Sequence, residues 1–100
     1  MEEKNQINIE IKPEIAGGKY SNLAIISHSH SEFVLDFAGM FPGQNKPEVV
    51  SRVIVSREHA KRLLAALNDN IRKYESQFGT IELPGQGNTY NMVNQNGTKS

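Results

Sequence analysis

The sequence predicts an α+β domain with the order β-β-β-β-α, in which a four-stranded antiparallel sheet precedes one long C-terminal helix. Two observations lead to this fold class. Short apolar segments, separated by Gly, Pro and polar residues, fill the first half of the 100-residue chain, which is typical of strands joined by turns. One long stretch with apolar residues at three- and four-residue spacing follows them, as expected for an amphipathic helix.

Four segments are expected to form the strands. In the first, Ile7, Ile9 and Ile11 alternate with polar residues, which is the period of a half-buried strand. The third alternates in the same way, with Phe33 and Phe37 on one side. The predicted strands are residues 6–11, 20–27, 32–40 and 49–55.

The helix is predicted over residues 57–78. Ser56 can cap its first turn, and Gly79 is a natural C-terminal stop. The spacing of its apolar residues gives one stripe, and it also fits a short coiled-coil seam. The stripe consists of Ala60, Leu64, Leu67, Ile71, Tyr74 and Phe78. We expect the middle of the stripe to pack on the chain's own sheet, with Leu64, Leu67 and Ile71 facing Phe33, Leu35 and Phe37.

A single domain is expected over residues 6–79, with a flexible N-terminus at residues 1–5 and a disordered or loosely attached tail at residues 80–100. The sequence has no cysteine, no signal-peptide pattern and no apolar run of membrane-spanning length. We therefore expect a cytoplasmic protein that does not contact the membrane. Eleven basic and eleven acidic residues cancel, which argues against nucleic acid as a partner because its binding proteins are typically basic.

The segment HSHSE, residues 28–32, has two interpretations. On an uninterrupted strand, His28, His30 and Glu32 would share one face, and two imidazoles with a carboxylate suit zinc or another first-row metal. The chain must also turn between the apolar runs that end at Ile26 and begin at Phe33, and a polar gap of this length suits a hairpin. We expect the hairpin and keep the metal site as the alternative. No arrangement of residues indicates catalysis or a cofactor.

The predicted sheet is wider than the helix that should cover it. Four strands span nearly 20 Å, whereas one helix is about 10 Å across, so some apolar surface should stay exposed. Exposed apolar patches usually mark association sites, and we therefore expect a homo-oligomer, a dimer or higher, that binds a further protein, as a chaperone-like module would. Weak association of nucleic acid with the basic side of the helix is a further alternative, although acidic residues interrupt that side. The candidate surface residues are Leu23, Ile25, Phe41 and Pro42.

Two stretches of the sequence carry a family resemblance. They read GGKYSNLAIISHSHSEFVLDFAGMFPG and VVSRVIVSREHAKRLLAALNDNIRKYE. The motifs Y-S-N, H-S, E-F, D-F, P-G and H-A-K-R-L-L, in that order, resemble a family of small bacterial proteins known as domain-of-unknown-function family 3467. The resemblance covers about residues 18–75 and implies a fold but no activity. The predicted element order is also similar to that of the export chaperone SecB, which would imply apolar grooves for unfolded chains.

Overall fold

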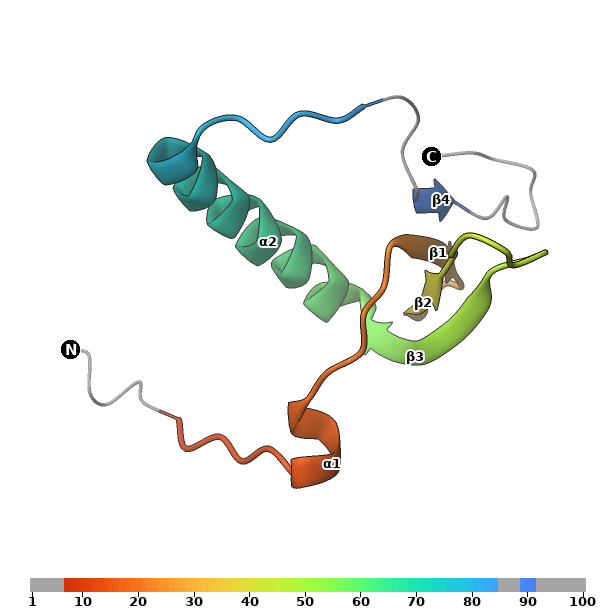
Figure 1. Ribbon diagram of the computed structural model, residues 1–100. Coiled ribbons are helices and arrows are strands. Elements are labelled where there is room, and N and C mark those ends of the chain that lie inside the picture. Colours follow the sequence, from red (N-terminus) through yellow and green to blue (C-terminus); the bar gives the residue numbers. More distant parts are fainter. Residues whose placement is uncertain (1–6, 85–88, 92–100) are drawn as a thin grey trace.

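The computed structural model of the chain describes residues 7–84 and 89–91, and Figure 1 shows its helices and strands. A short helix precedes three strands, a long helix follows them, and a three-residue strand comes last. In chain order the elements are α1 (Pro13–Ala16), β1 (Leu23–His28), β2 (Glu32–Gly39), β3 (Glu48–Ser56), α2 (Arg57–Phe78) and β4 (Thr89–Asn91).

The strands form one sheet with the order β3-β2-β1-β4. β1, β2 and β3 are antiparallel neighbours, and β4 pairs with β1 in parallel. Phe37 pairs with Ser51 whereas Ala38 pairs with Val49, so Val50 is an additional residue that makes a bulge in β3. The prediction of an α+β chain in which an antiparallel sheet is followed by a long helix is thus confirmed for three antiparallel strands.

The strand predicted at residues 6–11 is wrong for the part that the structure describes. Residues 7–12 are exposed and have no regular secondary structure, and residue 6 lies outside the described residues. Alternating apolar residues make a strand only where a neighbouring edge accepts its backbone hydrogen bonds, and β4 already pairs with the edge of β1. The described residues therefore lack the order of four strands followed by a helix, on which the likeness to SecB was based.

The predicted domain boundaries stay predictions. Residues 80–84 have no regular secondary structure, and residues 89–91 form β4. Residues 1–6, 85–88 and 92–100, which include the predicted flexible N-terminus and most of the predicted tail, lie outside the described residues.

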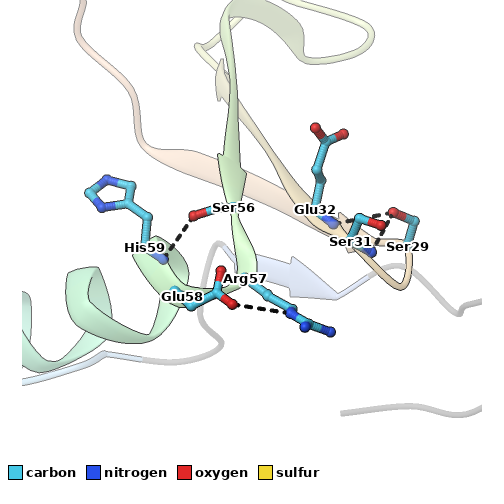
Figure 2. Close-up of polar contacts among 7 residues, drawn as sticks. All are labelled: Ser29, Ser31, Glu32, Ser56, Arg57, Glu58 and His59. Carbon is cyan, nitrogen blue, oxygen red and sulfur yellow. Dashed lines mark hydrogen bonds and ion pairs between the residues drawn. The ribbon is translucent and has the colours of Figure 1, made fainter.

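Two turns join the antiparallel strands where the sequence predicts them. Between β1 and β2, the Ser29 backbone N–H donates to the Glu32 carbonyl at 2.9 Å, and the Ser29 hydroxyl accepts from the Glu32 N–H at 3.3 Å (Figure 2). Between β2 and β3, the Gln44 N–H donates to the Phe41 carbonyl at 3.1 Å. Gly43 there has φ +90°, as the third residue of a type II turn requires. The hairpin interpretation of HSHSE is confirmed.

The Y-S-N residues fasten the end of β2 to the segment that precedes β1. The Asn22 side chain donates to the Met40 carbonyl and accepts from the Met40 N–H, both at 3.0 Å. The Ser21 hydroxyl donates to a β2 carbonyl at 2.8 Å, and the Tyr20 and Phe41 rings lie 6.1 Å apart. These three residues therefore hold the shape of the sheet.

α2 begins and ends where the sequence predicts. The Ser56 hydroxyl accepts from the His59 N–H at 3.1 Å (Figure 2), which satisfies one of the donors that every helix start leaves unpaired. At the other end, Gly79 has φ +98°, and its N–H donates to the Glu75 carbonyl at 2.9 Å. In the described part of the chain, no helix has the length and hydropathy to cross a membrane.

The prediction that α2 packs on its own sheet is wrong. β3 ends at Ser56 and α2 begins at Arg57, so no residue is left to reverse the direction of the chain. A helix that returns over a sheet usually follows a connection of about 2–6 residues. α2 instead continues away from the strands (Figure 1) and contains no buried residue. Leu64, Leu67 and Ile71 are therefore exposed instead of facing the sheet.

Asp36 on β2 and Arg52 on β3 form a cross-strand ion pair. Arg52 Nε and Nη2 donate to the two carboxylate oxygens at 2.6 and 2.9 Å, the two-bond arrangement that makes such pairs strong. These hydrogen bonds, assisted by the positive charge of Arg52, hold the pKa of Asp36 below its ordinary value against the desolvation of the carboxyl group. The pair thus fixes the register of β2 against β3.

The buried core is small. Within residues 7–84, the only buried apolar side chains are Leu23, Ala38 and Val55. A domain of about 70 residues is marginally stable even when it buries about 60% of its unfolded surface. A core of three side chains provides much less than that.

Replacing Ser56 with Ala is expected to lower the free energy of unfolding by about 1 kcal/mol, because the first turn of α2 loses its side-chain acceptor. Urea denaturation followed by circular dichroism measures this loss. Ser76→Ala in the last turn is the matched control, since the Ser76 hydroxyl donates only to the Lys73 carbonyl and its loss should change the midpoint little. Equal losses in both variants would show that Ser56 does not act as a cap.

Acid is expected to remove the stabilisation that the Asp36–Arg52 pair provides. Because the pKa of Asp36 is lowered on folding, its contribution is complete above the unfolded pKa of about 3.9. It is lost as the pH falls through the lower folded pKa. Urea midpoints from pH 2.5 to 7 should therefore show a smaller acid-induced decrease for Asp36→Asn than for the unmodified chain. Asp69→Asn, at an exposed ion pair with Lys73, should keep the full decrease.

Candidate interaction surface

An exposed apolar surface lies along α2. Ala60, Leu64, Leu67, Ile71, Tyr74 and Phe78 recur at helical spacing and share one face; we call this set the helix stripe. Leu64, Leu67 and Phe78 are 69%, 55% and 65% exposed, and the Tyr74 and Phe78 rings lie 4.9 Å apart. The 22 residues of α2 extend about 33 Å. The helix stripe therefore offers a partner a long and narrow apolar strip.

Charged residues border the helix stripe. Lys61 is exposed and Glu75 is half-buried. The Glu75 carboxylate accepts from the Ile81 N–H at 2.9 Å, which fixes its position at the end of the helix. Elsewhere on α2, Asp69 pairs with Lys73 at 3.2 Å. The helix thus combines an apolar strip with defined charges along its edge.

One face of the sheet is a second apolar surface, and we call it the aromatic face. Residues that pair across antiparallel strands point to the same side, so the pairs Ile26–Leu35, His28–Phe33, Phe33–Val55, Leu35–Val53 and Phe37–Ser51 place these side chains together. The His28 and Phe33 rings lie 5.4 Å apart. Phe33, Leu35 and Phe37 are all half-buried. Val55 on this face is buried at the end of β3, whereas Val53 is 41% exposed, and α2 contributes no buried residue to the face.

A hollow of about 430 Å³ adjoins the aromatic face. Glu14, Ile15 and Lys19 border it on one side, and Phe37 and Val53 border it on the other. Ser21 and Ser51 also line it, but most of its surface is apolar. The hollow therefore continues the apolar surface of the aromatic face.

The opposite face of the sheet is divided by charge. The pairs Val34–Ile54 and Asp36–Arg52 lie next to each other on it, so the ion pair interrupts its apolar residues. Asp36 is buried, with 13% of its side chain accessible, whereas the Arg52 side chain is 64% accessible. This face is consequently a less continuous apolar surface than the aromatic face.

The structure separates the three residues of the metal hypothesis. His28 is the last residue of β1 and lies on the aromatic face beside Phe33. Glu32 pairs with Ser56 and therefore points to the other face, while His30 lies in the turn between them. Within the described ranges, no three histidine or acidic side chains lie close enough together to hold a metal ion.

The predicted interaction residues fall in different places. Leu23 is only 8% exposed and belongs to the core. Ile25 is half-buried and pairs with Asp36 on the face of the sheet opposite the aromatic face. Phe41 and Pro42 are exposed in the loop between β2 and β3. These four residues do not form one continuous patch on the sheet.

The basic residues considered for nucleic acid are also dispersed. Arg52 lies on the sheet in its pair with Asp36, and Arg57 contacts Glu58 at 3.3 Å (Figure 2). Together with the pairing of Lys73, these contacts leave acidic groups among the basic ones. The positions of these basic residues therefore do not support a nucleic-acid-binding surface.

Two features were missed by reasoning from the sequence. The Asp36–Arg52 pair was visible only as opposite charges in two neighbouring predicted strands, and its detection required the register. The exposure of the helix stripe had a clearer signal, since Ser56 both follows the last predicted strand and caps the helix. The sequence could therefore have shown that no residues connect the last strand to the helix.

Comparison with known proteins places the chain in a family. No curated protein and no solved structure matches it. The family model described as "Protein of unknown function (DUF3467)" matches residues 1–83, which is most of the chain and includes every element from α1 to α2. The resemblance that the sequence motifs indicated is thus confirmed, and the chain belongs to the DUF3467 family.

Proposed function

We propose that this protein is an interaction module that works as a homo-oligomer and uses the helix stripe for self-assembly. The observation that carries the proposal is that α2 has no buried residue although it displays a continuous apolar stripe. The aromatic face is then the surface available to a further protein, and a chaperone-like role would use it to hold apolar segments.

The physics of isolated helices supports self-assembly. A helix in a protein gains most of its stability from packing an amphipathic face, and α2 has no buried residue. α2 has good caps at both ends, yet these contribute only about 1 kcal/mol each. A partner that covers the helix stripe would provide the missing packing.

The small core supports the same conclusion. Residues 7–84 bury only three apolar side chains, while large apolar residues are exposed on α2 and along the segments at both ends of this range. Contiguous exposed apolar surface of this kind usually marks an association site. Copies of the same chain are the most economical partners, because closed symmetric oligomers are common among soluble proteins.

Sedimentation velocity of the full chain between 1 and 100 μM is expected to show a dimer or larger oligomer. The thermal midpoint should rise with concentration, because folding is coupled to assembly. Leu67→Glu places a charge in the middle of the helix stripe and should weaken association about a hundredfold or more.

Ala65→Glu is the matched control for this variant. Ala65 is exposed on α2 but lies outside the helix stripe, so its substitution should leave the oligomeric state unchanged. A compact, folded monomer with a concentration-independent midpoint would overturn the proposed function. An effect of Ala65→Glu equal to that of Leu67→Glu would show that the helix stripe is not the assembly surface.

A further inference from the structure

We infer that two copies of the chain pair through α2 in antiparallel orientation, with the two helix stripes face to face and Lys61 of each copy against Glu75 of the other. This inference rests on the self-assembly proposed above. It adds the number of copies that pair, the direction of their helices and the residues that determine the register.

The spacing of the helix stripe matches the a and d positions of a coiled coil. Leu64, Ile71 and Phe78 occupy one of these positions, and Ala60, Leu67 and Tyr74 occupy the other. In an antiparallel pair each a residue faces a d residue. With the two-fold axis between Leu67 and Ile71, these two residues face each other across the axis, and Leu64 faces Tyr74 of the second copy.

The end layers of this arrangement match in size. Ala60, the smallest residue of the helix stripe, lies opposite Phe78 of the second copy, the residue at the far end. Close packing favours small residues opposite large ones. The exposed ring of Phe78 would therefore pack over Ala60 of the second copy and fill the space that the small alanine side chain leaves.

The flanking charges favour the same orientation. Lys61 follows Ala60 and Glu75 follows Tyr74, so both lie along the same edge of the helix stripe, fourteen residues apart. Antiparallel helices bring these equivalent edges together, which places Lys61 against Glu75 of the second copy. The two-fold symmetry forms this contact twice. Asn68 lies midway between Lys61 and Glu75 and therefore faces Asn68 of the second copy.

Parallel pairing lacks both kinds of complementarity. It would set Phe78 against Phe78 and Ala60 against Ala60, which crowds one end and leaves space at the other. Opposite edges would then meet, with Glu75 beside Asn70 of the second copy. No pair of opposite charges would form along the helix stripe.

Both charged side chains can make the proposed contact. Within residues 7–84, the ion pairs of α2 are Arg57–Glu58 and Asp69–Lys73, and neither includes Lys61 or Glu75. One oxygen of Glu75 accepts from the Ile81 N–H. A carboxylate has further acceptor capacity on its second oxygen, so Lys61 of the second copy can donate there while Ile81 keeps the carboxylate at the edge of the helix stripe.

Charge reversal tests the orientation. Lys61→Glu alone and Glu75→Lys alone each replace two attractive contacts with two repulsive ones, and each is expected to weaken self-association about tenfold at low salt. An equimolar mixture of the two single variants should recover the affinity of the unmodified chain, because one copy then carries two acidic residues and the other two basic residues. The double variant Lys61→Glu/Glu75→Lys should also recover it. Sedimentation equilibrium measures all four, and 0.5 M NaCl should reduce the differences.

Disulfide cross-linking provides a second measurement, because the chain has no cysteine of its own. Lys61→Cys mixed with Glu75→Cys should form a cross-linked dimer under mild oxidation. Each variant alone should not, since equivalent positions lie about 21 Å apart along antiparallel helices and a disulfide requires Cα atoms within about 7 Å.

The outcomes separate this inference from the proposed function. Cross-linking that is no greater in the mixture than in the single variants, or a mixture of charge variants that associates no better than either alone, overturns the antiparallel orientation. If Leu67→Glu still dissociates the oligomer in that case, self-assembly through the helix stripe stands. A monomeric unmodified chain overturns both.

Discussion

The direct junction between β3 and α2 is the constraint on which the rest of the molecule depends. Stable domains usually bury a sheet under a second layer of secondary structure. Here the strand ends at Ser56 and the helix begins at Arg57, so the only long helix of the described chain cannot form that layer. The sheet and α2 each retain an apolar surface, and neither shields the other. The fold is consequently a set of well-formed elements that share only a small buried core.

Individual polar and aromatic contacts therefore hold this chain in shape, and several of the family motif residues make them. Tyr20, Ser21 and Asn22 fasten β2 to the segment before β1. The Phe41–Gln44 turn directs the chain toward β3, and Asp36 binds Arg52 across the strands. A resemblance carried by such residues reports a common architecture.

The sequence was informative wherever structure depends on neighbours along the chain. The polar gap around His30 predicted the first hairpin, and Ser56 and Gly79 predicted both ends of α2, because turns and caps are local interactions. The failures concern contacts between distant segments. The isoleucines of residues 7–11 have the strand period but no strand forms there. The helix stripe indicated that α2 packs on something, yet the pattern alone could not say whether the surface belongs to the same chain. Asp36 and Arg52 could be paired only once the register was known.

The outer edge of the sheet limits how such a chain can associate. β3 is one of the two edge strands, and an edge with regularly spaced free backbone groups would let further chains add strands without limit, as in a fibre. Pro47 stands just before this strand and removes one donor, Val50 breaks the regular spacing, and Arg52 carries an exposed charge halfway along. These irregularities make open-ended growth of the sheet unfavourable. The exposed apolar side chains are thereby combined with an edge that disfavours strand addition, so that the self-assembly proposed above would end in a closed assembly of fixed size.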